Sequence, residues 1–174
     1  LSIVTGTTAG GQVNLHIVLT NPYLNADLGP GESGTVAVTA IEGFDCRVVL
    51  PATYFLAGVS FPVQGLNVGT LPDLIVGLAE PVAVVDGKAT LASLTIFADA
   101  STDAACYMRN PSQSPTFADA MAGVATLGAG EAEAFKMFPV SDSFDLPVFV
   151  FNPDAVTVVA TENETWSNVK ALYR

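Results

Sequence analysis

The chain has 174 residues, of which half are hydrophobic and only 13% are charged, and 17 Asp and Glu against six Lys and Arg give it a formal net charge of −11. This length and composition predict one folded domain, 1–174, rather than a disordered chain. The scarcity of basic residues argues against nucleic acid and anionic membrane surfaces as partners, because both are bound through clusters of Lys and Arg. No apolar run reaches the ~18 residues of a membrane-spanning helix.

The first half of the chain shows the period-two alternation of strands that bury one face. Residues 13–19 alternate apolar and polar side chains until Asn21-Pro22 ends the run, and residues 34–41 follow a turn-rich stretch. Residues 44–50 form the clearest strand, with Phe44, Cys46, Val48 and Leu50 predicted to face one way. Further strands are predicted at 54–61 and, in one or two short pieces, within 66–78.

A β-hairpin is the most specific local prediction. Asp86-Gly87 lies between two apolar runs, 82–85 and 88–97. A two-residue type I′ turn needs positive φ at both central residues, which Asp-Gly supplies. We therefore expect antiparallel strands joined at this dipeptide.

The second half is less regular. Residues 99–146 are rich in Ser, Thr, Ala, Gly and Pro and are predicted to be a loop-rich insertion, with 117–124 either a helical turn or a strand and 132–140 a strand. Strands return at 147–151 and 155–160. Residues 165–174 predict a short C-terminal helix, because Thr165 can cap it and apolar side chains recur at helical spacing.

Together these elements predict an all-β domain, a jelly-roll or Greek-key β-sandwich of about 8–10 strands with the insertion and the short C-terminal helix. The start at Leu1 without an initiator Met suggests a processed, exported protein, or a start chosen for expression. Cys46 and Cys106 match no metal or redox motif, so they are either one disulfide or two buried thiols. We predict that they meet, since a bond would anchor the loose 99–146 segment.

Catalytic patterns are nearly absent, and the sequence predicts no enzyme. The one histidine, His16, lies on the polar side of its strand and is read as a surface residue rather than a general base. No phosphate loop, nucleophile elbow or metal-binding Cys and His spacing occurs. No resident cofactor is predicted. Calcium is the one metal that the loops could hold, because their oxygen-bearing side chains suit it. The alternative is that these residues are ordinary turn residues in contact with solvent. The candidate ligands are Asn21, Asn25, Asp27 and Glu32, and separately Asp142, Asp145, Asn152 and Asp154.

Three segments resemble bacterial extracellular β-sandwiches of the cohesin and carbohydrate-binding-module type. They are the Gly-rich turn and alternating strand of residues 6–15, the strand 44–50, and the stretch 86–96 that begins Asp-Gly-Lys. The similarity covers about the first hundred residues, and the 99–146 segment departs from the family pattern. It implies a secreted or cell-surface domain used for attachment or assembly, with no binding residue carried over.

Low charge and surplus apolar area predict an extracellular structural protein, the subunit of a self-assembling surface filament or layer. The alternative is a cohesin-like or carbohydrate-binding adhesion module with a protein or carbohydrate ligand. Self-association to a homo-oligomer or polymer is predicted through the two termini. The β-prone N-terminal segment is expected to detach and pair with a strand of a second copy, and the apolar side chains on one face of the C-terminal helix are expected to dock on a second copy. The residues expected to contact a second copy are Leu1, Ile3, Val4, Trp166, Val169, Leu172 and Tyr173.

Overall fold

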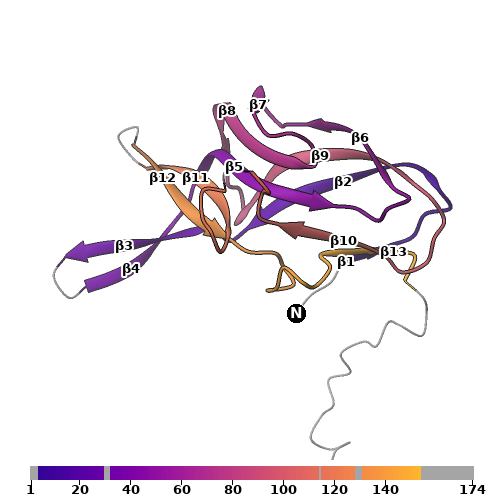
Figure 1. Ribbon diagram of the computed structural model, residues 1–174. Helices are drawn as coiled ribbons and strands as arrows, with labels where there is room; N and C mark the ends of the chain where they lie inside the picture. The colour runs from indigo at the N-terminus through magenta and orange to yellow at the C-terminus, as the bar shows by residue number, and fades with distance from the viewer. Residues whose placement is uncertain (1–3, 30–31, 114, 128–130, 154–174) are drawn as a thin grey trace, which may run out of the picture.

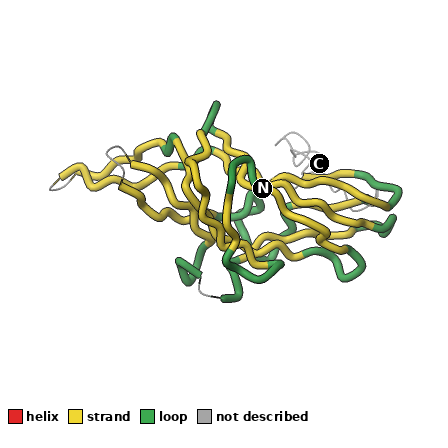
Figure 2. Tube along the Cα trace, turned by 90° about the horizontal axis from the view of Figure 1, so that it is seen from above, coloured by secondary structure: helices red, strands yellow, loops and turns green. Residues whose placement is uncertain are grey.

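The computed structural model describes residues 4–29, 32–113, 115–127 and 131–153, and all regular structure in these ranges is β-strand, with no helix (Figure 2). The all-β prediction is confirmed for this part of the chain, which holds more strands than the 8–10 expected. In order they are β1 (Val4–Gly6), β2 (Gly11–Thr20), β3 (Tyr23–Gly29), β4 (Glu32–Ala37), β5 (Ala40–Val49), β6 (Phe55–Ser60), β7 (Gly65–Asn67), β8 (Asp73–Ala83), β9 (Lys88–Ala98), β10 (Ala104–Arg109), β11 (Met121–Leu127), β12 (Glu131–Met137) and β13 (Phe149–Phe151).

Three sheets contain these strands (Figure 1). The largest sheet has the strand order β1-β13-β10-β5-β11-β12. β8 pairs with the edge of β5 that β10 and β11 leave free, and β7 pairs with β8. A three-stranded sheet has the order β2-β9-β6, while β3 and β4 form a two-stranded sheet of their own. The jelly-roll or Greek-key connectivity expected from the sequence stays a prediction.

The two larger sheets share one hydrophobic core. Phe44, Cys46 and Val48 are 2%, 0% and 5% exposed on β5, and they belong to the same buried cluster as Leu94 and Ile96 of β9. Because alternate residues of a strand point to opposite faces, the burial of these three side chains in the core is what the alternation in 44–50 predicts, although Asp45 on the opposite face is also buried. The prediction of which face of this strand is buried is confirmed.

The segment predicted to be a loop-rich insertion, 99–146, contains three strands. β12 confirms the strand predicted at 132–140, and β11 shows that the end of 117–124 is a strand and not a helical turn, whereas β10 was not predicted. β10 and β11 pair one after the other with the same edge of β5, with Arg109 opposite Arg47 and Ala122 opposite Asp45. The residues between them, 110–120, therefore leave the sheet and return to it. Small residues with low β-propensity are held in strands here by pairing with β5, which local sequence does not reveal.

The turn at Asp86-Gly87 is confirmed, with φ of 50° and 71° at its two residues. Val85 and Lys88 exchange two backbone hydrogen bonds across it, of 2.8 and 2.9 Å. Beyond this bridge the flanking strands separate, because β8 pairs with β5 and β7 whereas β9 pairs with β2 and β6. The turn thus connects the two main sheets, and the expected long antiparallel hairpin is wrong.

β3 and β4 form a hairpin that extends away from the body of the molecule, which we call the arm (Figures 1 and 2). Its base is anchored by Leu24 and Val38, which are 4% and 5% exposed in the core, and by a 3.1 Å hydrogen bond from the amide of Val38 to the carbonyl of Pro22. Tyr23 and Val36 are exposed. The sequence prediction placed only a turn before residues 34–41 and missed β3.

The N-terminal strand β1 pairs in parallel with β13 of the same chain, with Val4 opposite Phe149. In this structure the segment predicted to detach is paired with its own chain from Val4 onward. The strand expected at 155–160 and the helix expected at 165–174 lie outside the described residues.

Candidate functional site

Two carboxylates are buried on the outer face of the largest sheet. Asp45 of β5 and Asp73 of β8 are each 3% exposed. In the register Arg47 lies opposite Asp73, and Asp45 lies two residues from Arg47, so all three side chains share one face. This is the face opposite Cys46 and the core. A charge buried outside the core needs partners, and the loop 110–120 supplies them.

Asp45 accepts two hydrogen bonds from backbone amides. The amide of Ala122 donates to Oδ1 at 2.6 Å, and the amide of Thr116 donates to Oδ2 at 2.9 Å. Ala122 is 1% exposed. One carboxylate therefore holds the loop at two points, one inside it and one where it rejoins the sheet as β11.

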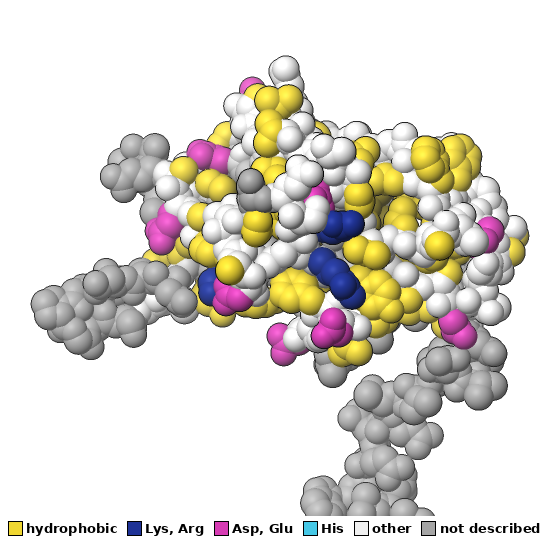
Figure 3. All heavy atoms as spheres, in the orientation of Figure 1, with side chains coloured by type: hydrophobic (Ala, Val, Ile, Leu, Met, Phe, Trp, Pro, Cys, Tyr) yellow, Lys and Arg dark blue, Asp and Glu magenta, His cyan; other side chains and the backbone are white. Residues whose placement is uncertain are grey.

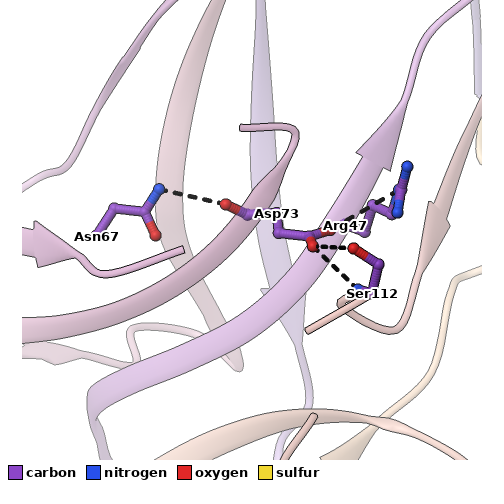
Figure 4. A network of polar contacts seen from close by, with 4 residues as sticks. All are labelled: Arg47, Asn67, Asp73 and Ser112. Atoms are coloured by element: carbon purple, nitrogen blue, oxygen red, sulfur yellow. Dashed lines mark hydrogen bonds and ion pairs between the residues drawn. The ribbon is translucent and has the colours of Figure 1, made fainter. Parts of the chain in front are cut away.

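Asp73 holds the start of the same loop (Figure 4). Its Oδ2 accepts from the amide of Ser112 at 3.0 Å and from the hydroxyl of the same residue. Its Oδ1 has no hydrogen-bond partner and lies 3.7 Å from Nε of Arg47, an ion-pair distance. Asn67 fixes the backbone at this point, because its Nδ2 donates to the Asp73 carbonyl at 3.3 Å.

This arrangement holds the loop 110–120 and the start of β11 against the sheet. Three of the four carboxylate oxygens of Asp45 and Asp73 accept hydrogen bonds from the loop 110–120 or from the start of β11, so none of these three is presented to a substrate. A general acid or base must reach the proton that it transfers. The pair is a structural clamp, and sequence reasoning missed it because its partners lie 39 to 77 residues away in the chain.

His16 is exposed on β2, and its Nδ1 lies 2.8 Å from the Ser93 hydroxyl on β9. This is the surface position predicted for it. The two residues are register partners, and Asn14 and Thr95 repeat the pattern two residues away with a 3.2 Å side-chain hydrogen bond. His16 thus belongs to a row of polar side chains on the outer face of the three-stranded sheet.

The predicted disulfide is not formed, and both cysteines are buried free thiols. The register explains why: Tyr107 pairs with Val49, so Cys106 lies near the end of β5, whereas Cys46 lies three residues earlier on that strand. Three to four residues of strand separate the two by about 10–13 Å, beyond the ~7 Å between Cα atoms that a disulfide tolerates. Burial raises the pKa of the Cys106 thiol to about 12, and burial together with the nearby Asp45 raises that of Cys46 further.

In the described part of the chain, no group of three or more His, Cys, Asp or Glu side chains could hold a metal. The side chains of Asn25, Asp27 and Glu32 lie outside the described ones, so the first candidate set stays a prediction. Asn152 instead organises turns: its Oδ1 accepts from the Thr8 amide at 2.6 Å, and its Nδ2 donates to the Ser101 carbonyl at 3.1 Å. Asp145 lies 4.0 Å from Arg109 and is 94% exposed. Asp154 lies outside the described residues.

Of the residues predicted to mediate self-association, only Val4 is described, and its side chain is 51% exposed. The others, Leu1, Ile3, Trp166, Val169, Leu172 and Tyr173, lie outside the described residues, and their role stays a prediction.

Large apolar side chains are exposed over much of the described surface, as the yellow areas of Figure 3 show on one face. Those at least 45% exposed are Val4, Val18, Tyr23, Val36, Phe55, Leu66, Val68, Leu71, Val85, Phe97, Phe138 and Val140. This is the surplus apolar area that composition predicts, and it provides surface for a partner.

An open groove of about 430 Å³ lies where β5 ends and β6 begins. Its walls are mostly apolar, with Arg47 the one charged lining residue. The remaining lining residues are Val48, Val49, Leu50, Pro51, Ala52, Tyr54, Phe55, Leu56, Leu71 and Pro72. β6 pairs only with β9 among the described strands, so the groove lies beside an edge strand.

Within the described ranges, the structure has no helix of the length and apolar character needed to cross a membrane. Comparisons with family models, curated proteins and solved structures find no match for this chain. The resemblance to cohesin-type sandwiches therefore rests on the three sequence segments alone and stays a prediction.

Proposed function

We propose that this chain is a non-catalytic, extracellular structural protein that assembles with copies of itself into a surface filament or layer. The observation that carries the proposal is the arm. β3 and β4 pair only with each other in the described part of the chain, and they extend beyond the body. A two-stranded ribbon alone is marginally stable in water, and each of its outer edges offers unpaired backbone groups. A neighbouring subunit would supply both the missing strand and the missing burial.

The surface composition supports the same proposal. Exposed Tyr23 and Val36 lie on the arm, and exposed Phe55 and Leu71 lie at the groove. Protein interfaces are enriched in aromatic side chains and depleted of charge at their centre, and only 13% of this sequence is charged. The jelly-roll or Greek-key class predicted from the sequence belongs to this proposal, since such sandwiches present edge strands that can be extended by a partner.

Negative-stain microscopy of the full chain at physiological ionic strength tests the proposal. We expect elongated particles with a repeat, and we expect that replacing residues 23–37 with a short Gly-Ser turn abolishes them. The same images of a Glu133→Lys variant are the control, because this exposed β12 residue is on neither the arm nor the groove. Isolated compact particles from the unmodified chain at high concentration would show that the proposal is wrong.

A carbohydrate-binding role is the second candidate, and the outer face of the β2-β9-β6 sheet favours it. Apart from His16, Lys88 is the one basic or acidic residue of these three strands. Asn14, Ser93 and Thr95 offer neutral hydrogen-bonding groups, and two phenylalanines, Phe55 and Phe97, are paired across β6 and β9 and are 65% and 49% exposed. Neutral polar groups beside exposed rings suit a polyhydroxylated ligand.

Calorimetric titration with soluble oligosaccharides tests this second role. Binding that is lost in Phe97→Ala and kept in Phe138→Ala, an exposed phenylalanine outside this sheet, would support it. Absence of heat with a broad panel of sugars would leave assembly as the one supported function.

A further inference from the structure

We draw no further inference here: the strongest candidate, the open and mostly apolar groove where β5 ends and β6 begins, carries nothing, because nothing in the described part of the chain shows what covers it.

Discussion

Asp45→Ala removes the carboxylate that holds the loop 110–120 at two points. Hydrogen bonds to a charged acceptor contribute about 1.5–3 kcal/mol each. The amide of Thr116 is on an exposed residue and can turn to water, so its bond contributes at the low end, whereas Ala122 is 1% exposed and its amide, 2.6 Å from Oδ1, would stay unsatisfied. We therefore expect the free energy of unfolding to fall by about 3–4 kcal/mol.

Urea denaturation followed by circular dichroism measures this loss, and Glu133→Ala, at an exposed position on β12, is the control expected to change stability by less than about 0.5 kcal/mol. Hydrogen exchange of the Ala122 amide gives a second readout, because its acceptor is removed. A loss below about 1 kcal/mol for Asp45→Ala, with unchanged exchange at Ala122, would refute the clamp.

Three further predictions concern the turn, the thiols and one surface ion pair. Gly87→Val should lower the free energy of unfolding by about 1–3 kcal/mol, since φ is +71° there; a neutral effect in thermal unfolding would contradict this. Cys46 and Cys106 should not react with a thiol reagent at pH 8 in the folded protein, and both should react after unfolding without reductant, because burial raises the pKa of each; fewer than two reactive thiols would indicate a disulfide. The pKa of Asp119 lies below its ordinary value because Lys136 donates a hydrogen bond to it at 2.7 Å. The small stabilising contribution of this pair is therefore present near neutral pH and is lost as the pH falls through the lowered pKa. Lys136→Met should raise the pKa of Asp119 in an NMR titration, and an unchanged pKa would exclude the pair.

The sequence was enough to predict features that depend only on residues close together in the chain. The alternation of Phe44, Cys46 and Val48 was enough to predict both the strand and its buried face, because period-two burial is a local property. Asp86-Gly87 was enough to predict the turn, because its positive φ values are a property of the dipeptide.

Features set by strand register could not be predicted in this way. Cys46 and Cys106 appeared suited to a bond, and only the pairing of β10 with β5 shows that they are several residues apart along the sheet. Asp45 and Asp73 looked like two of many acidic residues, since the loop amides that they hold become neighbours only when β10 and β11 line the same edge of β5.

The first strand of the arm, β3, was not predicted either, for a different reason. The turn-rich stretch before residues 34–41 predicts a turn, but Asn21-Pro22 marks the end of the preceding strand and gives no sign that a new strand, Tyr23–Gly29, begins there. In the structure Leu24 pairs with Val36 across that turn.

The weight-average mass of the full chain, followed by static light scattering over a wide range of concentration, tests most directly the central claim of assembly into a filament or layer. The account predicts a mass that starts near 17.9 kDa and rises with concentration without a plateau at a small whole number of subunits. A mass that stays at the monomer value throughout, or that stops at the dimer, would contradict it.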